Sequence, residues 1–171
     1  MSDTAQAIHH PVIAEAHCWV DATPFRAWLR QLLSDTGLPW RVLARAARVS
    51  PTVVHRLLEQ QPNRPLPRLR QLDAKRLLGL RSAGIRRLAV EPTACEPLRM
   101  LAWALGLRGA SPAEIATFIG TDIIATRSLM AGNPICCTKL MQLRAEAACQ
   151  AWGVDPDELL RSQPGHAVGR R

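Results

Sequence analysis

Apolar residues in the first third of the chain recur at helical spacing and are bounded by residues that begin or end helices. Between Thr23-Pro24 and Gly37 the pattern is carried by Phe25, Trp28, Leu29, Leu32 and Leu33. Thr suits a helix N-cap, Pro suits the first helical position, and Gly is typical of a helix end. The sequence therefore predicts a helix that begins at Thr23-Pro24 and ends at Gly37.

Two more helices are predicted directly after the first, joined by a short turn. Leu38-Pro39 begins one of them, which ends at Ala46 or Ala47. Arg48-Val49 forms the predicted turn. Ser50-Pro51 again supplies an N-cap and a first-turn proline, and the helix that follows runs to about Gln60.

The flanking segments carry weaker patterns. Residues 1–22 show no sustained period and are predicted to form a loose arm, of which Trp19 and Val20 dock on the first domain. The Pro- and Arg-rich segment 61–70 is predicted to be a loop. Asp73 is the expected cap of a fourth helix that continues through Leu80.

The apolar positions of residues 43–60 match those that a helix-turn-helix buries to fix the crossing angle of its two helices. Five of them are apolar and a sixth is small where the helices approach closely. These six are Leu43, Ala47, Val49, Val54, Leu57 and the small Ala44. On these residues the segment 38–60 resembles the motif of the lambda-repressor or Cro-like family, with one departure: Arg48 stands where the family usually has Gly. Such an Arg has to adopt a left-handed or strained backbone unless the turn differs.

The resemblance implies that the exposed face of the helix after Ser50 reads DNA in the major groove. The positions of that face are Ser50, Pro51, Thr52, His55, Arg56 and Glu59. Ser50 or the first-turn amides suit a phosphate, Thr52 a phosphate or a thymine methyl, and Arg56 a guanine edge, while His55 suits either kind of contact. Additional contacts to the DNA backbone are expected from Arg41, Arg45, Arg64, Arg68 and Arg70. The alternative is that this face is the ordinary solvent-exposed side of an amphipathic helix.

A second copy of the pattern follows at a constant offset of 72 residues. Leu29, Leu33, Leu43, Ala44, Ala47 and Leu57 align with Leu101, Leu105, Ile115, Ala116, Ile119 and Leu129. Ser111 to Glu114 has the form of a capping box, and Gly120 stands where Arg48 stood. Thr121 and Thr126 replace Val49 and Val54, so the packing between the helices is only partly reproduced.

The equivalent reading face of the second copy is mostly apolar. It consists of Asp122, Ile123, Ile124, Arg127, Ser128 and Ala131. A face with one arginine is poorly suited to phosphates. Two roles are open for it: a second DNA contact through Arg127, or a structural or partner-binding surface. After Pro134 the sequence predicts a long helix from Ile135 to Ala151, then a short helix capped by Asp155 and a basic tail.

Composition supports an all-α fold. Ala, Leu and Arg dominate, Tyr is absent, and Val, Ile and Thr do not alternate as they do in strands. The expected architecture is two tandem helix-turn-helix domains or one fused helical array. Its parts are an arm (1–22), a first, DNA-binding domain (23–92), a second domain (93–162) and a tail (163–171).

The charge is unevenly distributed along the 171 residues, whose formal net charge is +8. Residues 1–94 contain 14 Lys and Arg against 7 Asp and Glu, whereas residues 95–171 contain 8 against 7. A basic face raises affinity for a polyanion through phosphate contacts and counterion release. The positive field therefore belongs to the half with the better motif, although an Arg-rich solvated surface would give the same count.

The five cysteines contain no Cys-x-x-Cys pair, and no zinc site is expected. Cys136 and Cys149 fall in one predicted helix, about 20 Å apart, whereas disulfide formation needs Cα atoms about 4.4–6.8 Å apart. Buried free thiols are the expectation, with a redox switch as the alternative. His9, His10, His17 and Cys18 are interpreted as part of a flexible tail in preference to a metal site.

Catalytic motifs are missing from the sequence. It has no Gly-rich phosphate loop, no His-Glu-x-x-His, no Gly-x-Ser-x-Gly and no paired catalytic carboxylates. We expect a non-enzyme without cofactors. No apolar window of about 18 residues and no signal peptide are found, so a cytoplasmic, nucleoid-associated location without membrane contact is expected.

Two functions remain. The first is a sequence-specific transcription regulator of double-stranded DNA, in particular a repressor, that reads DNA through residues 50–60. In its two-part layout the chain also resembles, loosely, the immunity repressors of actinobacterial phages and related host regulators. The second is a protein-interaction module that binds another regulator, or a second copy of the chain, through the second domain. Tandem motifs can read an asymmetric site, whereas one motif generally needs a two-fold partner and a palindrome.

Overall fold

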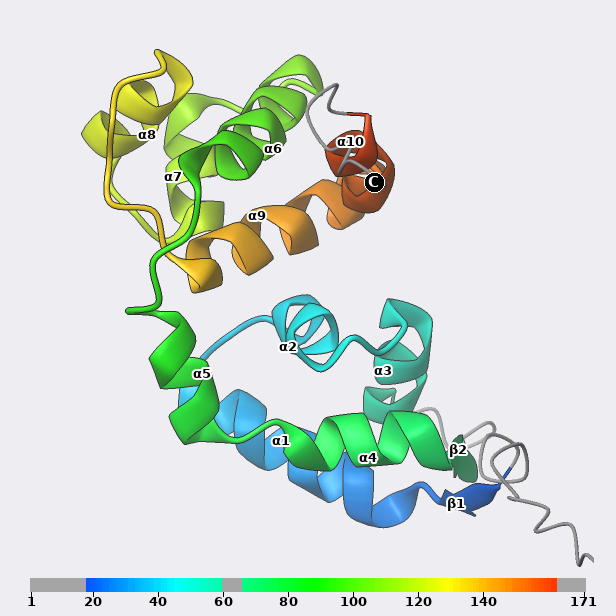
Figure 1. Cartoon of the computed structure of the whole chain (residues 1–171). Helices are drawn as coiled ribbons and strands as arrows, with labels where there is room; N and C mark the ends of the chain where they lie inside the picture. Colours follow the sequence, from blue (N-terminus) through cyan, green and yellow to red (C-terminus); the bar gives the residue numbers. More distant parts are fainter. Residues whose placement is uncertain (1–17, 60–65, 163–171) are drawn as a thin grey trace, which may run out of the picture.

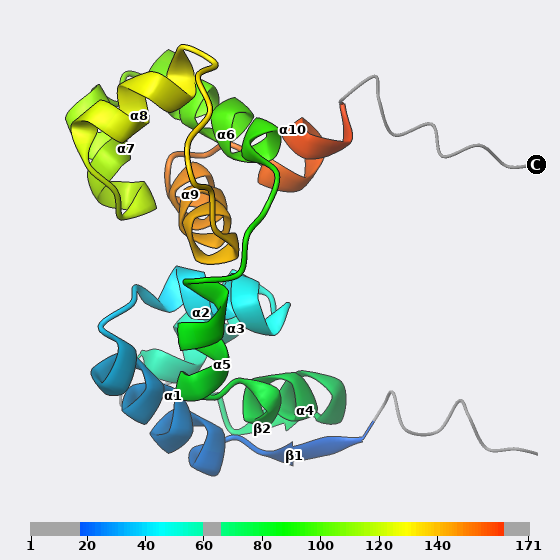
Figure 2. The same cartoon turned by 60° about the vertical axis from the view of Figure 1, so that its left-hand side comes forward.

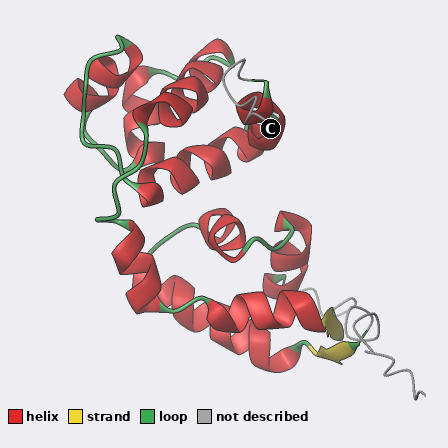
Figure 3. Cartoon of the chain, viewed as in Figure 1, coloured by secondary structure: helices red, strands yellow, loops and turns green. Residues whose placement is uncertain are grey.

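The fold is all-α, as the sequence predicts. A computed structural model of the chain describes residues 18–59 and 66–162. This part contains ten helices and two short strands (Figure 3). The expectations for residues 1–17, with His9, His10 and His17, for Arg64 and for the tail 163–171 concern residues outside the described ranges.

The first half holds helices α1 (Thr23–Thr36), α2 (Trp40–Ala47), α3 (Pro51–Leu58), α4 (Gln71–Gly79) and α5 (Ser82–Leu88). The first three lie where the sequence predicts them, and Gly37 ends α1 in the left-handed conformation, with φ 63°. The cap of α1 is predicted wrongly, because Thr23 is its first helical residue. The Asp21 carboxylate accepts hydrogen bonds from the Thr23 backbone N–H and hydroxyl, both at 3.0 Å, and these bonds lower the pKa of Asp21.

Two three-residue strands, β1 (Trp19–Asp21) and β2 (Arg68–Arg70), pair antiparallel beside the first half. Val20 lies opposite Leu69, which is buried in the first core. The pairing corrects two predictions, since β1 belongs to the expected loose arm and β2 to the expected loop. Three residues are too few for the alternation of apolar and polar side chains that identifies a strand.

The fourth helix also differs from the prediction at its start. Arg70 precedes α4 as its N-cap residue, so Asp73 lies within the first turn and does not cap the helix. An acidic side chain in that turn still interacts favourably with the helix dipole. α5 was not expected from the sequence, and its buried residue is Ile85.

The second half holds α6 (Cys95–Leu107), α7 (Pro112–Ile119), α8 (Ile123–Met130), α9 (Lys139–Ala151) and α10 (Pro156–Arg161). The predicted capping box of Ser111 and Glu114 is present, and its hydrogen bonds lower the pKa of Glu114. Asp155 caps α10 as predicted. α9 begins four residues later than expected, with Thr138 as its cap.

Helix α9 joins the two halves into one array. Leu143 and Ala147 on one face belong to the core of the first half, whereas Ala145 and Cys149 on the opposite face belong to the core of the second. Figures 1 and 2 show α9 lying across α2, with α5 as the connection between the halves. The halves therefore share a helix and do not meet as two separate domains.

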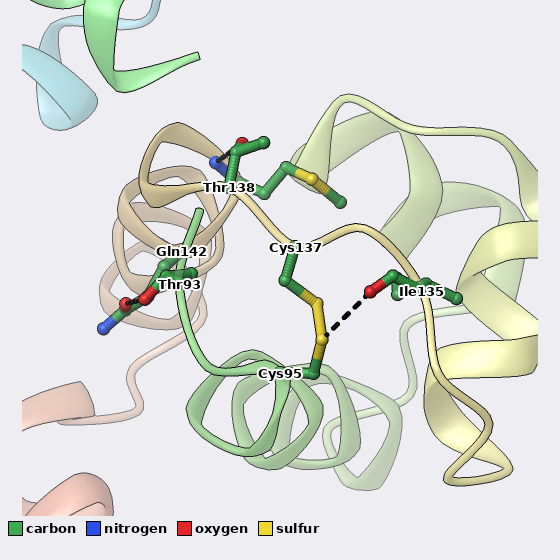
Figure 4. The surroundings of a disulfide bond; sticks show 7 residues. Thr93, Cys95, Ile135, Cys137, Thr138 and Gln142 are labelled. Atoms are coloured by element: carbon green, nitrogen blue, oxygen red, sulfur yellow. Dashed lines mark hydrogen bonds between the residues drawn. A yellow bond between two sulfur atoms is a disulfide. The ribbon is translucent and has the colours of Figure 1, made fainter. Parts of the chain in front are cut away.

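A disulfide bond links Cys95, at the start of α6, to Cys137 in the extended segment before α9 (Figure 4). Their Cα atoms are 5.5 Å apart. The expectation of free thiols is therefore wrong for this pair. It holds for the buried Cys149, where burial raises the pKa of the thiol to about 12. Cys136 lies outside α9, so the helix that was expected to separate it from Cys149 does not include it.

Candidate nucleic-acid interface

The turn between α2 and α3 has the geometry of a helix-turn-helix. Arg48 adopts the left-handed conformation with φ 54° and ψ 40°, and the Val49 N–H donates to the Ala44 carbonyl at 3.0 Å. In the second half Gly120 has φ 81°, and the Thr121 N–H donates to the Ala116 carbonyl at 3.0 Å. The two turns thus share one hydrogen-bond pattern at the offset of 72 residues.

The packing behind the turn follows the predicted pattern. All six predicted interior positions of the first copy, from Leu43 to Leu57, are buried. In the second copy Thr126 takes the place of Val54 and is fully buried, and its hydroxyl donates to the Asp122 carbonyl at 2.9 Å. That hydrogen bond satisfies the buried hydroxyl, so the substitution leaves no unpaired polar group.

The outer face of α3 presents three of the predicted DNA-reading side chains to solvent. Thr52, His55 and Arg56 are exposed. His55 Nδ1 lies 3.3 Å from a Glu59 carboxylate oxygen, and its ring centre is 5.2 Å from that of Trp40. His55 and Glu59 therefore already contact each other, whereas Thr52 and Arg56 are the side chains with free polar groups on this face.

A basic groove lies between α3, β2 and the start of α4. Five arginines line it: Arg48, Arg56, Arg68, Arg70 and Arg76. Its volume is about 500 Å³, and Ser50, Trp19 and a single carboxylate, Asp73, line it as well. Among the described residues, no carboxylate forms an ion pair with any of the five arginines. The groove thus concentrates uncompensated positive charge directly beside the exposed face of α3.

The groove brings together four predicted site residues and adds two that the prediction missed. Ser50, Arg56, Arg68 and Arg70 were predicted; Arg48 and Arg76 were not. Arg76 Nη1 donates to the Arg48 carbonyl at 2.9 Å, which holds α4 against the turn. The pairing of β1 with β2 also places Trp19 beneath the guanidinium of Arg70, at 5.8 Å. The basic, Arg-rich composition was the one sequence signal that pointed to these additional residues.

Arg45 lies elsewhere, in the contact between the two halves. Its guanidinium binds a Glu146 oxygen on α9 and an Asp157 oxygen on α10, each at 2.7 Å, and its side chain is 16% exposed. These carboxylates raise the pKa of Arg45, and the Arg45 hydrogen bonds lower the pKa of Asp157. The side chain is therefore committed to an interaction within the chain, so we leave Arg45 out of the DNA-facing set.

The start of α3 faces a second groove, of about 520 Å³, between the halves. Ser50 and Pro51 line it together with the carboxylates of Glu146 and Asp157. The Ser50 side chain makes no capping hydrogen bond. A phosphate at this helix N-terminus would lie near two carboxylates, which Arg45 neutralises only in part.

The two remaining predicted arginines do not line the basic groove. The Arg41 guanidinium stacks over the Trp40 ring at 4.3 Å, on the side of α2 that meets α7 and α9. Arg127 is exposed on α8 in the second half. Its neighbours on that face include Ile123 and Ile124, which are 37% and 75% exposed.

Two searches of the described residues bear on other kinds of site. Residues 18–59 and 66–162 contain no group of three or more His, Cys, Asp or Glu side chains placed to hold a metal ion. In the same ranges, no helix combines the length and the apolar character needed to cross a membrane.

The fold and the groove define the protein as an all-α chain with two helix-turn-helix-like units and one strongly basic surface. Comparisons of the chain with protein-family models, with curated proteins and with solved structures found no match. The function is therefore argued from the geometry of the site.

Proposed function

We propose that the protein is a sequence-specific DNA-binding transcription regulator whose first half docks on double-stranded DNA. The observation that carries the proposal is the basic groove of five arginines beside the exposed outer face of α3. Sequence-specific DNA binding needs side chains that reach base edges and cations that contact phosphates. The outer face of α3 offers the first, and the groove offers the second.

Arg56 belongs to both surfaces, since it is exposed on α3 and also lines the groove. We assign it to a guanine edge in the major groove, where a guanidinium can form two hydrogen bonds. Arg48, Arg68, Arg70 and Arg76 are assigned to phosphates, and Thr52 to a phosphate or a thymine methyl. Each phosphate that is neutralised releases counterions and steepens the dependence of binding on salt.

The experiment is a selection of bound DNA from a random pool with the wild-type chain and the Arg56→Ala variant. Loss of a base-edge contact is expected to relax discrimination at one base pair, at a cost of about 1–3 kcal/mol. The Arg68→Ala variant should instead weaken all sites similarly and lower the salt slope by about one. The length and symmetry of the recovered site also show how many motifs engage.

Arg86→Ala is the matched control, because Arg86 is an exposed arginine of the same half that does not line the groove. It removes the same charge and should change binding far less than either groove variant. If Arg56→Ala selects the wild-type consensus with wild-type affinity, the assignment of α3 as the reading helix is wrong.

A protein-interaction module remains the second candidate, and the exposed isoleucines of α8 favour it. Ile124 is 75% exposed beside Ile123, on a helix whose equivalent in the first half is polar. Exposed apolar groups of this kind are typical of contact surfaces for another protein. Binding that is insensitive to salt and to DNA sequence, and that is lost in Ile124→Asp, would favour this function over the first.

A further inference from the structure

A pocket of about 260 Å³ lies where α2, α7 and α9 meet. We call it the junction pocket. The residues that carry its chemistry are Arg41, Val42, Phe118, Arg144, Ala148 and Trp152. Because α2 belongs to the first half and α7 and α9 to the second, a molecule in this pocket would contact both halves at once.

The walls of the junction pocket are apolar and partly aromatic. The rings of Phe118 and Trp152 pack edge to face, with their centres 6.1 Å apart. Val42 and Ala148 add aliphatic surface from the two other helices. Small-molecule sites are generally apolar cavities with a few placed polar groups, and this volume is near the lower end of their range.

The polar groups of the junction pocket are two guanidinium groups. Arg41 comes from α2 and Arg144 from α9, and both are partly buried. Among the described residues neither forms an ion pair with a carboxylate, whereas Arg45, four residues after Arg41, binds two. A partly buried cation without a counter-charge is costly, so an anion in the pocket would relieve an existing electrostatic penalty.

Gly120 makes room for one of these cations. A Cβ atom at this position would collide with the Arg144 guanidinium, and its Cζ would be only 2.8 Å away. The left-handed turn of the second unit, with φ 81° at Gly120, therefore lets Arg144 extend along α7 to the pocket. Arginine recognises a carboxylate through two parallel hydrogen bonds, which fixes its orientation as well as its charge.

We propose that the junction pocket binds a small organic acid with an apolar or aromatic body. Its carboxylate pairs with Arg41 and Arg144, and its body packs against Phe118, Trp152 and Val42. Charge complementarity selects an anion, and the volume and the apolar walls select a compact ligand. Such a ligand stabilises the arrangement in which α2 and α9 are packed together. The proposal does not depend on DNA binding.

The test uses the full chain labelled with ¹⁵N and the probe 3-phenylpropionate, with the neutral 3-phenylpropionamide as the matched ligand. The indole N–H signal of Trp152 is assigned with Trp152→Phe. It should shift saturably with the acid, and the amide should bind at least about tenfold more weakly. Arg144→Gln and Arg41→Gln should each weaken the acid by a similar factor, whereas the control Arg127→Gln should leave it unchanged.

Three outcomes overturn the proposal. The first is equal affinity for the acid and the amide, which would make the pocket a purely apolar site. The second is wild-type affinity of both arginine variants, each checked for folding by circular dichroism. The third is the absence of any saturable shift with phenylpropionate, benzoate and hexanoate at millimolar concentration.

Discussion

Arg48 and Gly120 occupy equivalent turn positions, and the comparison shows what one residue contributes. Both have a left-handed backbone, with φ 54° and φ 81°. That conformation costs an L-residue roughly 1–2 kcal/mol, whereas glycine adopts it freely. Arg48 also lines the basic groove, so its side chain has a use that a glycine could not serve. We infer that local strain is retained here for the sake of the surface.

The Arg48→Gly variant is expected to be more stable but to bind DNA less tightly. Relief of strain exceeds the extra entropy that glycine gives the unfolded chain, so the free energy of unfolding should rise by about 0.5–1 kcal/mol. Loss of one groove cation should lower the affinity for DNA and its salt dependence. Urea unfolding and a DNA titration at several salt concentrations measure the two effects.

Gly120→Ala is the opposite change at the equivalent position and serves as the control. It should lower the free energy of unfolding, because alanine is strained at φ 81° and its Cβ meets Arg144. If Arg48→Gly leaves the affinity for DNA unchanged, Arg48 does not contact the nucleic acid.

At the scale of elements, α9 has an unusual position because two cores depend on it. Its two apolar stripes lie on opposite faces, and each is buried against a different half. Most helices of a globular protein bury one stripe and expose the other side to solvent. A change in α9 should therefore be felt in the half to which it does not belong by sequence.

Leu143→Ala tests this dependence. Leu143 is 8% exposed within the core of the first half, so its truncation should lower the free energy of unfolding by about 2–3 kcal/mol. Hydrogen exchange should show reduced protection in α2 as well as in α9. Leu107→Ala, at a leucine that is 83% exposed, should change the stability by less than about 0.5 kcal/mol. Unchanged exchange in α2 would mean that the halves are not coupled through α9.

The Cys95–Cys137 disulfide closes a sequence separation of 42 residues around the second unit. Closing a loop of this length should contribute about 2–4 kcal/mol by restricting the unfolded chain. Dithiothreitol should therefore lower the melting temperature of the wild-type chain and have no effect on the Cys95→Ser, Cys137→Ser double variant. Equal melting temperatures with and without reductant would show that the bond does not form in solution. Such bonds are rare in the cytosol, which is at odds with the location expected from the sequence.

The elements that sequence analysis predicts well are those with local signals at both ends. Gly37 for α1, the capping box of Ser111 and Asp155 for α10 each act within a few residues, so the printed sequence contains their whole cause. The strands, the disulfide and the start of α9 were missed because their cause is remote. β1 pairs with a segment about 50 residues away, and Cys137 holds the segment before α9 in an extended form.

At the scale of the whole molecule, the same distinction separates the predicted site residues. Arg56, Arg68 and Arg70 follow one another closely in the chain, and their grouping in the basic groove was within reach of the sequence. Arg45 was not, because its partners Glu146 and Asp157 are 101 and 112 residues away. An arginine on a helix surface has the same local pattern whether it faces a phosphate or a carboxylate of its own chain.

The ion pair of Arg45 with Asp157 makes the contact between the halves sensitive to acid. Arg45 holds the pKa of Asp157 below its ordinary value of 3.8, so the folded state binds a proton at this site less readily than the unfolded state does. The stabilisation is therefore complete above the unfolded pKa, decreases as the pH falls below it, and is lost once the pH falls through the folded pKa. Glu146, the second partner of Arg45, keeps its contact through Gln142 as well.

Asp157→Asn removes this titration while keeping the shape of the side chain. The difference in unfolding free energy between wild type and variant should be constant from about pH 7 to pH 5 and should shrink as the pH falls further. Urea unfolding at a series of pH values measures it, and Asp35→Asn, at an exposed carboxylate in the first half that forms no ion pair with a described residue, is the control. A difference that stays flat down to about pH 2 would mean that the two halves are not held together by Arg45 in solution. In that case the geometry between α3 and α8, and with it the spacing of any two-part DNA site, would depend on the apolar faces of α9 alone.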